Sequence, residues 1–294
     1  MKITELNIPF GDYTTYCRIV GEGSKPPLIL LHGGPGSTHN YFELLDPLAE
    51  TGRQIIMYDQ LGCGNSYIDH HPELWTEQTW RDELSNLIRY LQLDKFHLLG
   101  QSWGGMLAIS YLLNTVDNHA ISVILSSTLS SSTLWAHEQH RMISYMSEEE
   151  QNSIRDAELS GIWNKPEYLK ANDHYMKLHC SDIKETDPEC LRRPKKSGTE
   201  SYITGWGPNE YTPAGTLAAF DYTDRLSEIK IPALIISGTN DLCTPLIAKT
   251  MYDHLQNSRW ELFDGARHMC FAEQTDKYIE LLKEWMKSSE EKSV

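Results

Sequence analysis

The sequence has no long hydrophobic run and no metal-binding spacing, and each absence narrows what the protein can be. No stretch approaches eighteen consecutive apolar residues, so no transmembrane helix is expected. The amino terminus, starting at Met1, lacks an apolar core followed by a cleavage site and so gives no sign of a signal peptide. The six cysteines form no CxxC pair and no Cys/His metal spacing, which favours free thiols in a reducing cytosol and predicts neither a metal nor another cofactor. We therefore expect a cytoplasmic protein, with a loose association with the cell envelope left open.

Basic residues are also scarce, which excludes another class of function. Lys and Arg total 26 against 41 Asp and Glu, giving a formal net charge of −15. Because a nucleic-acid binder must neutralise phosphates with Lys and Arg, this balance argues against DNA or RNA as a partner. A hydrophobic fraction of 40% with 23% charged residues is ordinary for a globular protein. The length of 294 residues suits one α/β domain carrying an insertion, and nothing in the sequence gives the oligomeric state.

The most informative segment runs from Gly100 to Gly105 and has the sequence GQSWGG. It lies between an apolar run ending at Leu99 and a helix-like stretch starting at Met106, which is the strand–turn–helix setting of a nucleophile elbow. Such a tight turn strains the serine backbone and needs glycine on both sides, because side chains there would collide with the neighbouring strand and helix. We therefore predict that Ser102 is a nucleophile, although a GxSxG pattern alone also occurs in ordinary glycine-rich turns.

A serine nucleophile needs a base and an acid that orients the base. In the fold that carries this elbow, the chain order is Ser, then Asp or Glu, then His. Asp241 follows an apolar strand-like run at 233–237, and His268 follows another at 260–263. Catalytic groups gather beyond the carboxyl ends of strands in open α/β sheets. Only one of the twelve histidines, His268, occupies this slot, so we predict an acyl-transfer triad of Ser102, Asp241 and His268.

A glycine-rich loop supplies the third part of such a site. The apolar run 28–31 ends in the segment from His32 to Gly36, HGGPG, which matches the loop from which lipases and esterases donate a backbone N–H to the developing oxyanion. We expect the second donor to be the N–H of Trp103, the residue after the nucleophile. The loop has no GxxxxGK[ST] pattern and no lysine nearby, which argues against a phosphate cradle.

Apolar runs and helical periodicities alternate along most of the chain. This alternation predicts an α/β fold with a mostly parallel sheet and helices on both faces. Residues 3–20 have the pattern of a hairpin, and later strands are expected at 28–32, 54–58, 96–99, 121–125, 233–237 and 260–263. Apolar residues at a period of 3.6 mark amphipathic helices at 80–91 and 278–285.

The pattern changes between residues 129 and 225, where the strand signal fades. Helical, charged and aromatic segments dominate there, with helices expected at 135–145, 149–159 and 168–178 and with Pro and Gly between later segments. We interpret 129–225 as a helical cap that covers the site. The remaining residues, 1–128 and 226–294, would form the core domain into which the cap is inserted.

Several of these segments together resemble the prolyl aminopeptidases, which are the proline iminopeptidases of the α/β-hydrolase fold. The resemblance extends over essentially the whole chain and rests on HGGPG, YDQLGCGNS at 58–66, GQSWGG, GWGPNEYT at 205–212 and GTNDLCTP at 238–245. HGGPG and the GPNE part of the cap segment are its specific elements. It implies roles for six residues: Ser102 as nucleophile, His268 as base, Asp241 as orienting acid, Gly34 and Trp103 as oxyanion donors, and Glu210 as the carboxylate that holds the substrate's free amino end.

The resemblance implies a serine exopeptidase that releases N-terminal proline from short peptides through a prolyl-enzyme intermediate. A carboxylate under a cap suits this task, since it can form a charge-assisted hydrogen bond with the terminal ammonium while the cap blocks internal peptide bonds. One position departs from part of the family, where the residue after the triad aspartate is a glutamate that contacts the amine: here it is Leu242. An amino-acid amidase or esterase of the same fold would share the triad and the glycine-rich loop, and it stays the alternative.

Overall fold

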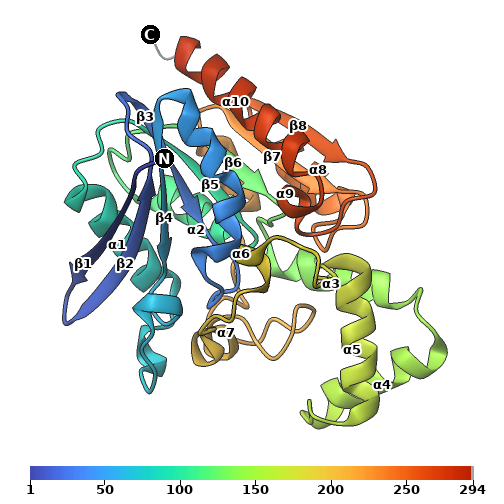
Figure 1. Ribbon diagram of the computed structural model, residues 1–294. Helices are drawn as coiled ribbons and strands as arrows, with labels where there is room; N and C mark the ends of the chain where they lie inside the picture. The colour runs from blue at the N-terminus through green and yellow to red at the C-terminus, as the bar shows by residue number, and fades with distance from the viewer. Residues whose placement is uncertain (293–294) are drawn as a thin grey trace.

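A twisted sheet of eight strands forms the centre of the molecule in the computed structural model, which describes residues 1–292 (Figure 1). The strands in chain order are β1 (Ile3–Phe10), β2 (Tyr13–Val20), β3 (Lys25–Leu31), β4 (Arg53–Asp59), β5 (Phe96–Gln101), β6 (Ala120–Ser126), β7 (Ala233–Gly238) and β8 (Ser258–Phe263). Their order across the sheet is β1-β2-β4-β3-β5-β6-β7-β8. The pairs β1–β2 and β2–β4 are antiparallel, whereas the pairings from β4–β3 to β7–β8 are parallel.

Helices cover both faces of the sheet, as the sequence predicts. One hydrophobic cluster joins the sheet to α1 (Glu77–Tyr90), α2 (Trp103–Asn114) and α8 (Pro245–His254). A second cluster joins the opposite face to η1 (His39–Thr51), α9 (Cys270–Glu273) and α10 (Thr275–Lys292). Strand β3 shows the alternation that produces two faces: Ile29 and Leu31 belong to the first cluster, and Leu28 and Leu30 to the second. The predicted hairpin and all six later strands are present, so the predicted fold class is confirmed.

The sequence patterns missed one element on the second face, the 3-10 helix η1. Pro47 lies inside it and has no backbone N–H to donate to the helix. The helix nevertheless buries Phe42, Leu45 and Leu48 against the sheet. Hydrophobic burial thus stabilises the segment on this face of the sheet, although a proline lies inside it.

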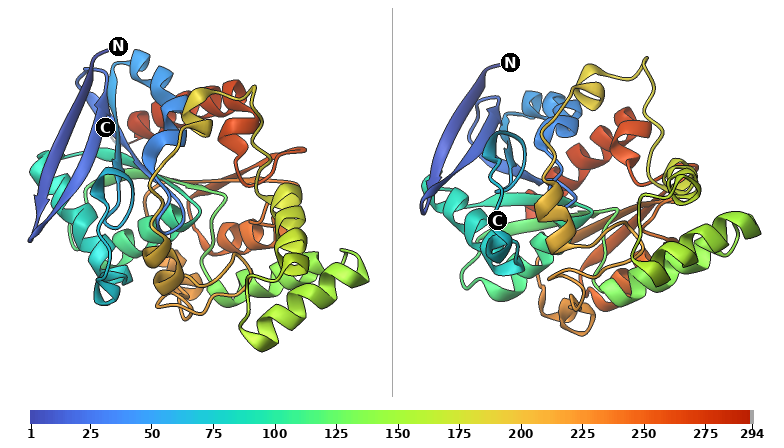
Figure 2. Two further views of the ribbon diagram at one scale, coloured as in Figure 1. Left: turned by 60° about the horizontal axis from the view of Figure 1, so that its bottom comes forward. Right: turned by 90° about the horizontal axis from the view of Figure 1, so that it is seen from below.

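A helical insertion connects β6 to β7, and it lies at the end of the sheet where the parallel strands finish (Figures 1 and 2). Its helices are α3 (Ser132–Ile143), α4 (Glu148–Ser160), α5 (Pro166–His179), α6 (Glu189–Arg192) and α7 (Thr199–Gly205). The three helices expected in the cap correspond to α3, α4 and α5. The domain boundaries at 128/129 and 225/226 stay a prediction.

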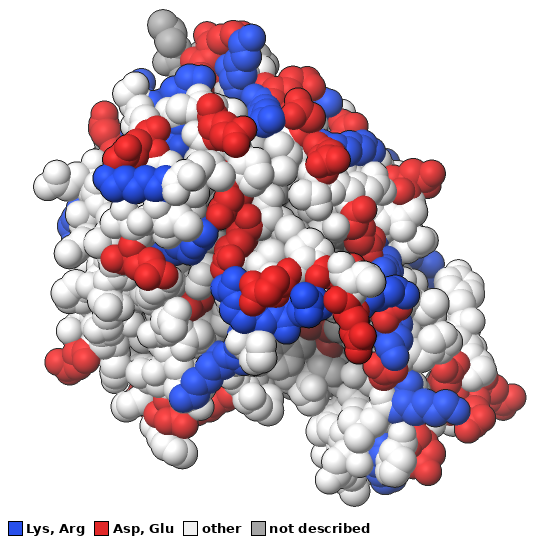
Figure 3. All heavy atoms as spheres, in the orientation of Figure 1, with Lys and Arg blue, Asp and Glu red and all other residues white. Residues whose placement is uncertain are grey.

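Acidic and basic side chains are interspersed on the face drawn in Figure 3, which is hollowed between the core and the lobe that contains α4 and α5.

Short 3-10 segments complete the connections: η2 (Gly64–Ser66), η3 (Pro72–Leu74) and η4 (Thr223–Glu228). In the part of the chain that the structure describes, no helix combines the length and the apolar character needed to cross a bilayer.

Candidate active site

Ser102 occupies a strained turn between β5 and α2. Its backbone has φ 56° and ψ −126°, a left-handed region that non-glycine residues rarely adopt. A Cβ on Gly100 would lie 2.2 Å from the carbonyl oxygen of Gly104, and a Cβ on Gly104 would lie 1.9 Å from that of Leu31. The Thr128 hydroxyl donates to the Ser102 carbonyl at 2.6 Å. The turn therefore has the close packing that the two flanking glycines predict.

Asp241 and His268 form a hydrogen-bonded pair just beyond the ends of β7 and β8. The Nδ1 atom of His268 lies 2.8 Å from Oδ1 of Asp241. The carboxylate also accepts hydrogen bonds from the Cys243 N–H at 2.8 Å, the Ser127 hydroxyl at 2.6 Å and the Gly238 N–H at 3.1 Å. Three donors besides the imidazole thus hold a nearly fully buried carboxylate in place beside Nδ1 of His268. This arrangement leaves Nε2 of the imidazole as the nitrogen that can take a proton from a nucleophile.

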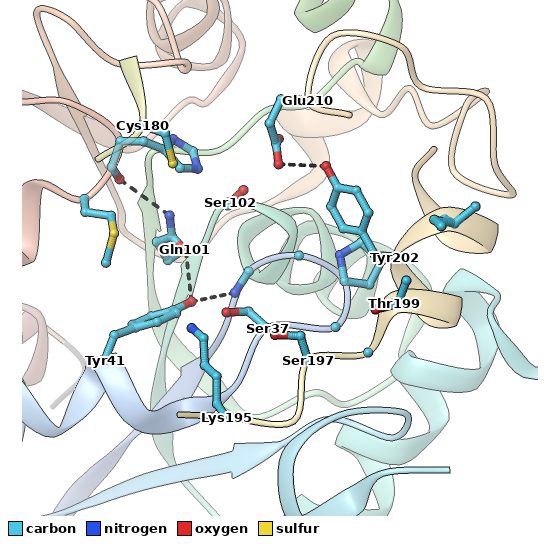
Figure 4. Close-up of a pocket in the computed structure, with 18 of the residues that line it drawn as sticks. Ser37, Tyr41, Gln101, Ser102, Cys180, Lys195, Ser197, Thr199, Tyr202 and Glu210 are labelled. Atoms are coloured by element: carbon cyan, nitrogen blue, oxygen red, sulfur yellow. Dashed lines mark hydrogen bonds between the residues drawn. The ribbon is translucent and has the colours of Figure 1, made fainter. Parts of the chain in front are cut away.

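Ser102 and His268 line a cavity of about 500 Å³ between the core and the cap (Figure 4). Gly34 and Glu210 line the same cavity. Asp241 lies behind His268, and Trp103 follows the serine as the first residue of α2. The structure therefore brings all six predicted site residues to one place, although they come from segments more than 230 residues apart in the chain.

The HGGPG loop presents the Gly34 N–H as a free backbone donor, whereas the Gly33 N–H is already bonded. The Gly33 N–H donates to the Tyr41 hydroxyl at 2.7 Å, and that hydroxyl donates to Oε1 of Gln101 at 2.9 Å. Within residues 1–292, the N–H groups of Gly34 and Trp103 have no hydrogen-bond acceptor. Gly34 has φ 115°, and a Cβ there would come within 2.6 Å of the Gly36 nitrogen, so glycine is required. The two uncommitted donors are the ones expected to bind an oxyanion.

Gln60 links the two segments that carry these donors. Its side chain accepts from the Trp103 indole Nε1 at 2.7 Å and donates to the His32 carbonyl at 2.9 Å. Its backbone N–H donates to Nε2 of His32 at 3.0 Å, and Nδ1 of that ring lies 2.9 Å from the Gly33 carbonyl oxygen. Burial lowers the pKa of His32 to about 4, so the ring is neutral with its proton on Nδ1. The network fixes the loop and the start of α2 relative to each other.

Glu210 projects from the cap into the cavity and faces Tyr202 (Figure 4). The Tyr202 hydroxyl donates to Oε1 of Glu210 at 2.8 Å, and the Trp135 indole donates to the Glu210 backbone carbonyl at 2.7 Å. Burial raises the pKa of Glu210, although His268 and the hydrogen bond from Tyr202 both act to lower it. A partly desolvated carboxylate of this kind interacts strongly with a cationic ligand group.

Leu242 takes no part in the cavity wall. Its side chain is fully buried, and its carbonyl accepts from Nε2 of Gln139 at 2.8 Å. Gln139 in turn accepts from the Tyr175 hydroxyl at 2.6 Å. The residue after Asp241 therefore packs the junction between core and cap, and the side chain that bonds to the Glu210 carboxylate is Tyr202, which the sequence patterns did not single out. Within residues 1–292, no group of three or more His, Cys, Asp or Glu side chains could hold a metal ion.

Comparison with known proteins places the chain in a family. Residues 26–275 match the α/β hydrolase fold family, so the protein is an α/β hydrolase. A proline iminopeptidase of Lactobacillus helveticus is 59% identical over 294 residues, covering 99% of this chain and 100% of the relative. One from Clostridioides difficile is 56% identical over 293 residues, with the same coverage. The crystal structure of proline iminopeptidase from Mycobacterium smegmatis has a TM-score of 0.87 at 29% identity, covering 99% of this chain and 100% of that one. The chain belongs to the proline iminopeptidase family.

Proposed function

We propose that the protein is a prolyl aminopeptidase, a serine exopeptidase that releases the N-terminal proline of short peptides. The observation that carries the proposal is the position of the Glu210 carboxylate in the same cavity as Ser102 and His268. A triad alone would serve any acyl transfer, whereas a carboxylate beside it selects a substrate with a cationic end. Membership of the proline iminopeptidase family supports the same activity.

In the proposed mechanism, the terminal ammonium binds Glu210 and the prolyl carbonyl oxygen accepts from the N–H groups of Gly34 and Trp103. His268 takes the proton of Ser102 as the serine oxygen attacks the carbonyl carbon. The tetrahedral intermediate then collapses, the C–N bond breaks, and the protonated imidazole gives its proton to the leaving amine. Water, deprotonated by the same histidine, hydrolyses the prolyl ester and regenerates the serine. Asp241 keeps the imidazole in the required tautomer throughout.

Proline suits this site because of the chemistry of its amino group. Its secondary ammonium offers two N–H groups, and its ring is compact and rigid, so little conformational entropy is lost on binding. A cavity of about 500 Å³ has room for a proline and a short extension. An N-acylated or internal proline has no ammonium, so it would leave the partly desolvated Glu210 carboxylate without a cationic partner, which costs binding energy.

A panel of amino-acid anilides tests the proposal against the amidase or esterase alternative. The wild-type protein should hydrolyse prolyl anilide with a kcat/KM at least about a hundredfold above that for N-acetylprolyl anilide, because the acetyl group removes the charge that Glu210 would pair with. Simple acyl esters serve as the comparison for the triad alone. Preferential turnover of the acylated anilide or of the esters would favour the alternative function.

The cellular location of the protein is part of the same proposal. We expect a cytoplasmic enzyme, with loose association with the cell envelope as the other outcome of a fractionation experiment. Peptides are the substrate class that the family implies.

A further inference from the structure

Lys195 is the only lysine or arginine on the wall of the active-site cavity, and Glu210 is the only carboxylate there among the residues that the structure describes. Figure 4 shows the lysine side chain reaching toward the cavity beside Tyr41 and Ser37, across Ser102 from Glu210. The cavity therefore presents one anion and one cation on opposite sides of the proposed nucleophile.

The neighbouring basic residues Arg193 and Lys196 contact other side chains, whereas Lys195 forms no ion pair within residues 1–292. Arg193 forms ion pairs with Glu43 at 2.8 Å and with Glu189 at 2.6 Å. The Lys196 ammonium lies 3.4 Å from the centroid of the Tyr67 ring. For Lys195, no carboxylate in residues 1–292 comes within ion-pair distance, and its nearest described ring, Tyr41, has its centroid 5.7 Å away. Its ammonium is available to a ligand.

The surroundings of Lys195 suit an anion. The hydroxyl-bearing residues Ser37, Ser197 and Thr199 line the same part of the cavity (Figure 4), and no protein acceptor or donor within residues 1–292 engages their hydroxyl groups. Although much of the Lys195 side chain is exposed, burial around its ammonium lowers its pKa. The electrostatic cost of that desolvation is recovered when an anion binds beside it.

We infer that Lys195, assisted by these hydroxyl groups, binds the terminal carboxylate of a Pro-X dipeptide while Glu210 holds the ammonium. This assignment rests on the proposed aminopeptidase function and names the substrate class: free dipeptides whose two charged ends bind on either side of Ser102. A dipeptide of this kind carries its carboxylate on the residue that leaves, so the lysine contacts the leaving group and not the proline. The carboxylate thereby adds affinity and positions the scissile bond.

The test compares matched substrates in matched variants. The wild-type protein should hydrolyse Pro-Ala with a kcat/KM roughly fivefold to tenfold above that for Pro-Ala amide, the range expected for one charge-assisted bond in a half-open site. In Lys195→Met the ratio should fall to about one, while Lys195→Arg should keep most of it. Lys196→Met is the control, since its ammonium lies on Tyr67 outside the cavity, and its ratio should match the wild type. Because each ratio is taken within one variant, a general loss of activity does not affect it.

The possible outcomes test the role of Lys195 separately from the proposed aminopeptidase function. A wild-type Pro-Ala to Pro-Ala amide ratio near one, or an unchanged ratio in Lys195→Met, would overturn the assignment of Lys195. If the wild type still hydrolyses prolyl anilide, the proposed aminopeptidase function stands in either case. Failure of the wild type to hydrolyse prolyl anilide would overturn both. A second pair, Pro-Glu amide and Pro-Gln amide, distinguishes an acidic side chain from a chain terminus. A lysine-dependent preference in that pair alone would contradict the terminal-carboxylate assignment. The Pro-Ala preference should also fall as ionic strength rises, a check that needs no variant.

Discussion

The indole ring of Trp135 lies edge-on to the imidazole of His268, with ring centroids 5.9 Å apart and an interplanar angle of 68°. The same indole donates through Nε1 to the backbone carbonyl of Glu210. One residue of the cap helix α3 therefore contacts both the proposed base and the segment that carries the proposed amine anchor. The cap contributes to the position of the proposed catalytic groups as well as to the shape of the cavity.

Trp135→Phe should preserve the ring contact with His268 and remove the donor to Glu210. An unpaired buried carbonyl costs about 1–3 kcal/mol, so kcat/KM for prolyl anilide should fall about tenfold, mainly through KM. Steady-state kinetics on the anilide and on a simple acyl ester measure the effect, which should be smaller on the ester. Trp163→Phe is the control, because Trp163 packs on Tyr168 elsewhere in the cap. Equal losses of kcat/KM in Trp135→Phe and Trp163→Phe would show that the bond from Trp135 to the Glu210 carbonyl has no specific effect on turnover.

Ser102→Ala should reduce kcat for prolyl anilide by about 10⁴-fold or more, because no other hydroxyl replaces the nucleophile. The substitution keeps the Cβ atom and therefore the steric demands of the turn, so the thermal unfolding midpoint should stay close to that of the wild type. Labelling with a fluorophosphonate, followed by mass spectrometry, should modify the wild-type serine and leave the variant untouched. Residual activity near the wild-type level would exclude Ser102 as the nucleophile.

Tyr202→Phe should change how activity depends on pH. The tyrosine hydroxyl bonds to the Glu210 carboxylate and lowers its pKa, whereas burial raises it. Removing the donor raises that pKa further, so the carboxylate becomes protonated at a higher pH and loses its charge there. The acid limb of kcat/KM for prolyl anilide should therefore move to higher pH, with the largest loss under acidic conditions. The same limb measured with an ester that has no amine should not move with it.

Acidification should destabilise the folded protein through His97, a buried residue that lies away from the active site. Its ring is fully buried, with Nδ1 2.7 Å from the Ser122 hydroxyl. Burial, with a contribution from Arg53, lowers the pKa of His97 to about 4, against about 6.5 for an unfolded chain. The unfolded state therefore binds a proton first, and stability present above pH 6.5 is lost as the pH falls toward 4, by on the order of 3 kcal/mol.

His97→Gln should flatten this dependence, since glutamine can bond to Ser122 without titrating. Denaturant unfolding at a series of pH values from neutral down to about pH 4 gives the slope of the unfolding free energy against pH. His137→Gln is the control, because the His137 side chain is largely exposed on α3. An identical pH slope in wild type and His97→Gln would show that this histidine does not contribute.

Local patterns were enough to single out the three residues proposed as nucleophile, base and acid, which the structure places at one end of the sheet. Ser102 directly follows β5, Asp241 and His268 lie in the loops after β7 and β8, and parallel strands bring their carboxyl ends to one edge of the sheet. Glu210 lies in the cap, where no periodic pattern points to the site, and only the resemblance of its segment to a known family singled it out. Its presence in the cavity agrees with that expectation, although its role stays a proposal.

The residues that support these groups could not be predicted in the same way. Gln60 bonds to Trp103, 43 residues later, and Trp135 bonds to the segment 75 residues further on. Lys195 lies in a connection between two short helices, and its sequence neighbours Arg193 and Lys196 make it look like part of a basic surface run. Which side chains meet across such distances depends on how loops pack, which neither residue type nor periodicity specifies.

In the proposed function Glu210 makes a serine hydrolase into an aminopeptidase, and Glu210→Gln is the substitution that tests this role. The substitution keeps the size of the side chain and its bond with Tyr202 but removes the charge. Steady-state kcat/KM should fall by about a hundredfold or more for prolyl anilide and by less than about threefold for a simple acyl ester. Equal losses on the two substrates would contradict the role of Glu210 as the anchor of the substrate's amino end.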